Sequence, residues 1–181
     1  QNPRRAKKLY KDIVPKTVDD YLDFLEKAKS QNELQLLMNP VWHVHNSKVP
    51  NEKMIMSFSM LLNLVETSNA NSKELLWKFV KKYKSNISEK DHPIFDKLVG
   101  YAIKYFNDVI KIKKKYKKPN KDEKFALEAL VKALEKCNDT MKPEDIQTLI
   151  YSTGKENGYS ENLRDWFKLI YEVVFGDENG P

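Results

Sequence analysis

Apolar residues recur three and four positions apart along most of this 181-residue chain, and no stretch alternates apolar with polar residues for long. Such spacing places apolar side chains on one face of an α-helix. The strongest stripe follows Asp91-His92-Pro93 and extends from Ile94 to Ile110. The pattern predicts an all-α protein of about eight or nine helices.

Start and stop signals place further helices. Asn71, with Glu74 three residues later, has the spacing of a capping box and predicts a helix start there. A second helix is expected over about Lys121 to Lys136, with these positions facing inward: Phe125, Leu127, Leu130, Val131 and Leu134.

Pro143 suits the first turn of the next helix, and Glu144 and Asp145 complement its dipole. Gly158 can end that helix and Ser160 can cap the last one. The predicted core face of the last helix is Leu163, Trp166, Phe167, Ile170 and Val174.

The best domain boundary is the lysine-rich segment 111–121, where the composition shifts and Pro119 is expected to stop the preceding helix. We therefore expect two packed helical bundles, one over residues 1–118 and one over residues 119–181.

Composition limits the partners and the cellular location that we expect for this chain. The net charge of +6 and the pI near 9.1 suit a polyanionic partner. Cys137 is the only cysteine, which excludes an internal disulfide. The sequence contains no leader pattern and no long uncharged apolar run, so we expect a cytoplasmic protein without a membrane partner.

Catalytic chemistry is not indicated. His43 and His45 could share a metal on an extended backbone, but no third ligand is evident nearby, so we expect Trp42 to be buried and both histidines to bond to backbone. Serine triads, paired carboxylates and glycine-rich phosphate loops are also missing. We predict no catalytic residue, no metal site and no cofactor in this chain.

Three strings identify a resemblance: Gln1–Leu9, Asn39–His45 (Asn-Pro-Val-Trp-His-Val-His) and Phe175–Pro181. In this order and at these separations they resemble class I lysyl-tRNA synthetases. The similarity continues at Ser57–Leu64, Glu74–Trp77, His92-Pro93, Leu98–Ala102 and Lys114–Pro119. The nucleotide-binding HIGH-type and KMSKS-type signatures of that family do not occur.

The resemblance implies the C-terminal, tRNA-binding part of such an enzyme, cut from a longer protein. The parent would attach lysine to tRNA-Lys with ATP and Mg²⁺, steps that belong to the missing half. The expected partner is tRNA-Lys and not DNA, and the chain is expected to be monomeric. The other interpretations are a helical protein-interaction scaffold and a general nucleic-acid-binding helical domain.

Two basic stretches are candidates for tRNA binding. By resemblance, Arg4, Arg5, Lys7 and Lys8 follow the stem-contact region; the alternative is an ordinary exposed face. The second stretch could bind phosphates and stack a tyrosine on a base, or be a solvated mobile linker; its candidates are Lys114, Lys115, Tyr116, Lys117 and Lys118.

Anticodon reading is expected at the last helix. Unstacked bases are recognised by aromatic or guanidinium planes and by hydrogen bonds to their Watson–Crick edges. Tyr159, Arg164, Lys168 and Tyr171 offer such groups, and Trp166 is a further candidate although its position favours the core. The ending from Gly176 to Pro181 resembles a helix–loop junction of lysyl and glutamyl class I synthetases.

Overall fold

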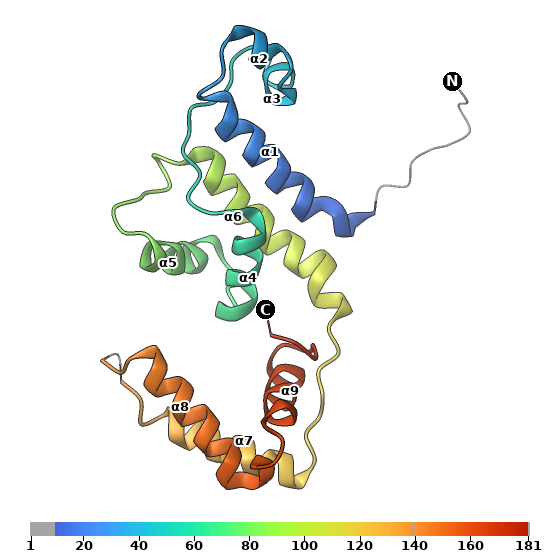
Figure 1. Cartoon of the computed structure of the whole chain (residues 1–181), viewed down its shortest axis with the longest axis vertical. Helices are drawn as coiled ribbons and strands as arrows, with labels where there is room; N and C mark the ends of the chain where they lie inside the picture. Colours follow the sequence, from blue (N-terminus) through green and yellow to red (C-terminus); the bar gives the residue numbers. More distant parts are fainter. Residues whose placement is uncertain (1–9, 139, 181) are drawn as a thin grey trace, which may run out of the picture. The chain divides into compact units, whose positions relative to one another are not determined.

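The computed structural model describes residues 10–138 and 140–180, and all regular structure in these ranges is helical, which confirms the all-α prediction (Figure 1). The chain divides into two compact units, Gln1–Ile112 and Lys113–Pro181. The division falls inside the lysine-rich segment 111–121, after Ile112 and not after Lys118. The backbone N–H groups of residues 115 and 117 bond to the last helix and the turn that follows it, so these residues belong to the second unit.

The first unit contains η1 (Lys11–Ile13), α1 (Val14–Ala28), α2 (Glu33–Leu37), α3 (Pro40–Val44), α4 (Phe58–Ser68), α5 (Lys73–Tyr83), α6 (Pro93–Tyr105) and the π-turn η2 (Phe106–Ile110). A short 3₁₀ turn, η3 (Lys111–Lys113), ends this helical run. Pro119 therefore does not stop the helix, contrary to our prediction.

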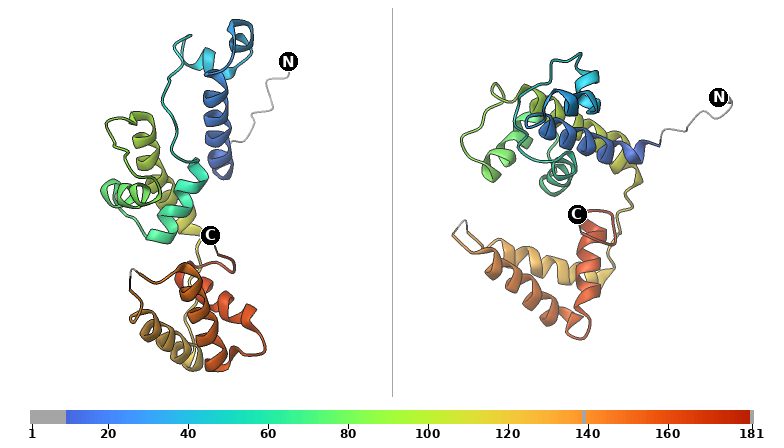
Figure 2. Two further views of the ribbon diagram at one scale, coloured as in Figure 1. Left: turned by 60° about the vertical axis from the view of Figure 1, so that its left-hand side comes forward. Right: turned by 45° about the horizontal axis from the view of Figure 1, so that its top comes forward.

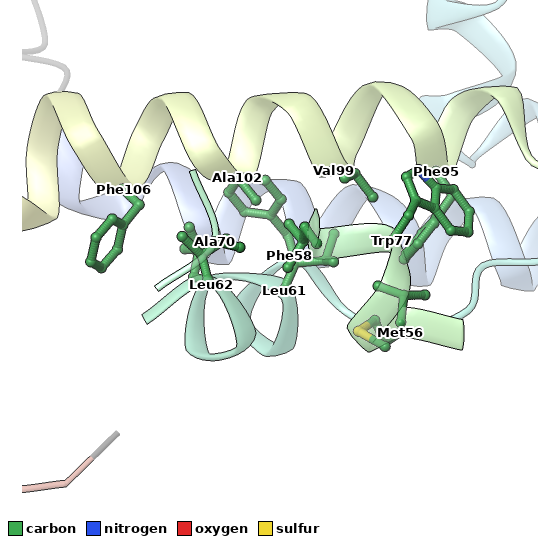
Figure 3. Packing of buried hydrophobic residues seen from close by; sticks show 13 residues of the cluster. Met56, Phe58, Leu61, Leu62, Ala70, Trp77, Phe95, Val99, Ala102 and Phe106 are labelled. Atoms are coloured by element: carbon green, nitrogen blue, oxygen red, sulfur yellow. The ribbon is translucent and has the colours of Figure 1, made fainter. Parts of the chain in front are cut away.

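The core of the first unit lies between α4, α5 and α6, with α4 contacting both of the others and α1 (Figure 3). Leu61, Leu76, Phe95 and Val99 are fully buried. Trp77 packs edge-on against Phe95, with ring centroids 5.6 Å apart. Burial of large apolar side chains is the main force that holds these helices together.

Two carboxylates from distant segments cap helices of this unit. Asp19 on α1 accepts hydrogen bonds from the backbone N–H groups of Phe58 and Ser59 at 2.6 and 3.2 Å. Glu52 accepts them from Ile94 and Phe95 at 2.7 and 2.8 Å. Each carboxylate satisfies N–H groups that the first turn leaves unpaired, and its charge suits the helix dipole.

Asn39 organises the corner between α1, α2 and α3. Its buried amide donates to the carbonyl of Phe24 and to the side chain of Gln31, at 2.9 and 2.8 Å. Its oxygen accepts from the Val41 N–H at 3.0 Å and so caps α3. Both the donor and the acceptor group of this buried amide are therefore used in holding three segments together.

The histidines beside this corner are structural. His43 contacts the Leu37 carbonyl at 2.7 Å, as predicted, whereas His45 contacts the Tyr21 hydroxyl at 2.7 Å and not backbone. Val41 is the buried apolar residue of the motif, whereas Trp42, which was predicted to be buried, is only partly buried. The prediction at Asn71 was one residue early, since Ser72 caps α5 by accepting from the Leu75 N–H.

The second unit contains α7 (Lys121–Leu134), α8 (Pro143–Gly154), the π-turn η4 (Lys155–Tyr159) and α9 (Leu163–Val174). Helices α7 and α8 pack side by side (Figure 2). α8 itself ends at Gly154, and the helical run that continues into η4 breaks at Gly158, whose φ is 97°, so the predicted break there is confirmed. Asn162, not Ser160, occupies the N-cap position of α9, and its side chain bonds not to the helix backbone but to the Asp165 carboxylate, to which its amide donates at 2.7 Å.

The core of the second unit is small: Ala126, Leu130, Trp166 and Leu169 are buried. Predicted core positions Phe125, Val131 and Val174 are instead 69%, 54% and 56% exposed. On α7 the buried face contains Ala126 and Leu130, four residues apart, and the Phe125 side chain lies beside this face and is exposed.

Candidate nucleic-acid interface

The lysine-rich segment 114–118 of the second unit is attached to α9; we call it the strap. Backbone N–H groups of Lys115 and Lys117 donate to the carbonyls of Gly176 and Glu172, each at 3.0 Å. Gly176 has a φ of 66°, and a Cβ there would lie 3.1 Å from the Lys115 nitrogen. Only glycine adopts this backbone without strain while allowing the strap so close.

The strap separates structural lysines from exposed ones. Lys114 has only 9% of its side chain exposed and pairs with Asp177 at 3.5 Å. Lys117 pairs with Glu123 at 2.8 Å and with Glu172 at 3.4 Å. Lys115, Tyr116 and Lys118 are exposed, and 55% of Tyr116 is accessible to solvent. The expectation of a freely solvated linker is therefore corrected, because backbone bonds and ion pairs fix this segment within the unit.

The ion pair between Lys117 of the strap and Glu123 of α7 shifts the pKa of both side chains. The hydrogen bond from Lys117, with one from the Asn120 backbone, lowers the pKa of Glu123. The bond to Glu123, supported by Glu172, raises the pKa of Lys117. Glu123 also completes a capping box with Asn120 at the start of α7. The strap is thus joined to α7 as well as to α9.

A polar cavity of about 450 Å³ lies along α9 and the loop that follows it. Three predicted anticodon-reading residues, Arg164, Lys168 and Tyr171, line it. Prediction from sequence missed the other lining residues, which are Asn162, Asp165, Phe167, Glu178 and Asn179. Helical spacing unites the first three, since residues three and four apart share a helix face.

The loop after α9 closes one side of this cavity. The Lys168 ammonium lies 3.3 Å from the carboxylate of Glu178 and 3.8 Å from that of Glu172. Gly180 approaches the Tyr171 ring so closely that an added Cβ would lie 2.9 Å from its Cζ. The Tyr171 ring also contacts Phe167 and Phe175, with centroids 6.3 and 6.2 Å apart.

Two further predicted anticodon-reading residues, Trp166 and Tyr159, do not line the cavity. Trp166 is completely buried and its indole N–H donates to the Ile150 carbonyl at 3.0 Å. A base cannot stack on a ring that the core encloses, so Trp166 is withdrawn from the candidates. Tyr159 packs against it at 5.1 Å, and burial is the largest of the effects that raise the pKa of its phenol. Tyr159 does not line the cavity.

Comparison with known proteins gives a consistent result along the whole chain. The lysine–tRNA ligase of Rickettsia peacockii (strain Rustic) is 39% identical over 183 residues, covering 100% of this chain. That of Roseobacter denitrificans is 39% identical over 181 residues, again covering 100%. The chain is similar to lysine–tRNA ligases. It spans only 35% and 34%, respectively, of those two proteins.

Other comparisons add nothing to this similarity. No protein-family profile matches the chain, and no solved structure matches it. Within residues 10–138 and 140–180, no helix is long and apolar enough to cross a membrane. In the same described ranges, no group of three or more His, Cys, Asp or Glu side chains is arranged to hold a metal ion.

The segment shared with lysine–tRNA ligases has an uneven charge. Residues 113–181 contain thirteen basic and thirteen acidic side chains, so the net charge of +6 comes entirely from residues 1–112. Part of that charge is Arg4, Arg5, Lys7 and Lys8, which lie outside the described residues and stay predictions. Because the second unit has no net charge, it does not attract an anion over a distance. It must bind an anion through individual donor side chains at fixed positions.

Proposed function

We propose that this chain is the C-terminal, tRNA-binding portion of a class I lysine–tRNA ligase, and that its second unit recognises the anticodon of tRNA-Lys. The parent enzyme joins lysine to tRNA with ATP and Mg²⁺, in the cytoplasm, and those chemical steps belong to its catalytic portion. The chain contributes tRNA docking and anticodon discrimination. It acts as a monomer and does not bind DNA.

The observation that carries this proposal is the cavity beside α9. It combines a guanidinium, an ammonium and a phenol ring with carboxylate and amide groups, at Arg164, Lys168, Tyr171, Glu178 and Asn179. Recognition of an unstacked base needs such a set: a ring to stack on, and both donors and acceptors for the base edge. The similarity to lysine–tRNA ligases over the whole chain supports tRNA as the ligand.

Hairpins that carry the anticodon stem-loop test the proposal. The chain should bind a hairpin with a UUU anticodon more tightly than one of identical stem with a changed anticodon, as measured by fluorescence anisotropy. Arg164→Ala and Tyr171→Ala should remove about 1–3 kcal/mol of that preference. Equal binding of both hairpins would indicate a general nucleic-acid-binding domain, and no binding would remove RNA recognition altogether.

The corner of the first unit favours a second candidate, a protein-interaction scaffold. Apolar side chains on α2 and α3 are unusually exposed, including Leu34 at 77%, Met38 at 85% and Val44 at 68%. Exposed apolar patches on a rigid scaffold are typical of protein contacts. Two results together would support the scaffold: RNA hairpins do not bind, and the wild type self-associates with rising concentration in analytical ultracentrifugation. The double variant Leu34→Ser, Met38→Ser should then abolish that self-association.

A further inference from the structure

Two side chains of opposite charge, Lys168 and Glu178, lie next to each other in the lining of the cavity. Lys168 and Glu178 lie 3.3 Å apart, with 42% and 69% of their side chains exposed. An ion pair this exposed contributes little stability. An ammonium has three donor hydrogens and a carboxylate has two acceptor oxygens, so their mutual contact leaves both groups able to bond to a ligand as well.

A donor and an acceptor that lie side by side complement one kind of base edge once the stacked base has a fixed orientation. Uracil presents a keto oxygen beside an imino N–H on its Watson–Crick edge, as guanine and hypoxanthine do. Cytosine and adenine present the reverse, an amino group beside a ring nitrogen with a lone pair. With the ring held in one orientation, the carboxylate accepts from the imino N–H but repels a ring-nitrogen lone pair in the same place. The ammonium then donates to the keto oxygen but has no acceptor where an amino group takes its place.

We infer that Lys168 and Glu178 form a reading pair for a keto–imino base edge, with Glu178 accepting the imino N–H and Lys168 donating to the keto oxygen. The inference rests on the proposed function, since it assigns base specificity within the same cavity. Tyr171, which also lines the cavity, supplies the ring on which the base stacks.

The surroundings of the pair fit this role. Asn162 and Asp165, also at the cavity, bond to each other at 2.7 Å. Arg164 lies four residues before Lys168 on the same helix, where its guanidinium can contact a phosphate of the same nucleotide chain. Glu172 also lies near Lys168, at 3.8 Å, but it is bound to Lys117 of the strap and does not line the cavity.

The test compares U with C and inosine with A. The two bases of each pair have rings of the same size, so a difference in binding does not come from the volume of the cavity. Hairpins with identical stems carry UUU, CCC, AAA or, as a keto counterpart of adenine, three inosines in the anticodon positions. Binding of the full chain to each is measured by fluorescence anisotropy at one salt concentration. The wild type should bind U over C, and inosine over A, by about five- to 150-fold in each pair.

Glu178→Gln should reduce both ratios to near unity, because a carboxamide can rotate to offer either a donor or an acceptor. Lys168→Met should lower them as well. The matched control is Glu161→Gln, which makes the same change of charge at an exposed residue that does not line the cavity. The control should change affinity for all four hairpins alike and leave both ratios unchanged.

The outcomes distinguish failure of the reading pair from failure of anticodon recognition as a whole. If the wild type shows both preferences and Glu178→Gln keeps them, the reading pair is overturned while anticodon recognition stands. If Glu178→Gln instead weakens all four hairpins equally, Glu178 only tethers the loop, and the inference fails again. If the wild type binds all hairpins equally, or none, the inference and the proposed anticodon recognition fail together. Collapse of both ratios in Glu178→Gln, with the ratios intact in Glu161→Gln, supports the inference.

Discussion

At the scale of single residues, the second unit depends on one contact between a tryptophan and a glycine. Gly154, at the end of α8, leaves room for the Trp166 ring, and an added Cβ would lie 2.5 Å from the Trp166 Cδ1. The buried indole N–H is satisfied by the Ile150 carbonyl one turn earlier on α8. Among the described residues this hydrophobic core has only four buried members, so any displacement of Trp166 affects most of it.

We therefore predict that Gly154→Ala destabilises the second unit by about 1–3 kcal/mol, because overpacking forces a buried ring out of its position. Gly100→Ala in α6 is the matched control: its Cβ would lie 3.5 Å from the nearest atom, an ordinary contact. Alanine there should be neutral or stabilising by up to about 1 kcal/mol. A urea titration followed residue by residue by NMR measures both; equal effects would exclude the packing explanation.

The sequence correctly predicted the burial of single residues where their position on a helix face alone determines it. Trp166 fell on the apolar face of the last helix and is buried. Phe125 was misplaced because hydrophobicity alone does not reveal that α7 buries the face that contains the small Ala126 and Leu130. Glu178 was missed because it follows a helix end, and the path of a loop after a left-handed Gly176 is not encoded in helical periodicity.

At the scale of elements, helix types and approximate ranges were predictable, but several helix starts were not. Asn120 with Glu123 forms a local capping box, which lies within four consecutive residues and can be read from sequence. The caps that Asp19 and Glu52 provide come from segments far from the helices they serve. Such long-range caps are set by tertiary packing, so a local pattern cannot indicate them.

The strap is an element held by charge, and it should show a pH dependence. The pKa of Glu123 is lowered from 4.5 in the folded protein, so its charge stabilises the second unit above that pH. This stability should decline as the pH falls below 4.5 and through the lower folded pKa. For Lys117, whose pKa is raised from 10.5, the contribution is complete below pH 10.5 and disappears as the pH rises through the higher folded pKa.

The variant that isolates this effect is Glu123→Gln, since glutamine at this position preserves the capping box while removing the charge. We expect it to be less stable than the wild type at pH 7, and the difference should shrink as the pH decreases below 4.5. Urea midpoints of the second unit, measured at several pH values, report this difference. A difference that stays constant down to low pH would mean that the ion pair with Lys117 contributes nothing.

At the scale of the whole molecule, charge and specificity are divided between the two units. The net charge of +6 lies entirely in residues 1–112, whereas the cavity belongs to the neutral second unit. Attraction of a polyanion over a distance depends on net charge, but discrimination between bases depends on placed donors and acceptors. We expect salt to act mainly on the contribution of the first unit.

Replacing Lys115 and Lys118 by Ala should flatten the slope of log K against log salt for binding of an anticodon hairpin. The change should be about 0.7–0.9 for each phosphate that the variant no longer neutralises. Both lysines are exposed on the strap, whereas Lys132 and Lys136 are exposed residues outside it and supply a control pair with the same change of charge.

Most of the slope should remain in the strap variant, because the excess of positive charge lies in residues 1–112. If the control pair flattens the slope as much as the strap pair does, the strap acts only through net charge. If the strap pair leaves the slope unchanged, its exposed lysines touch no phosphate. In that case the strap only connects α7 and α9, through Lys117, and RNA binding must depend on the cavity and the first unit.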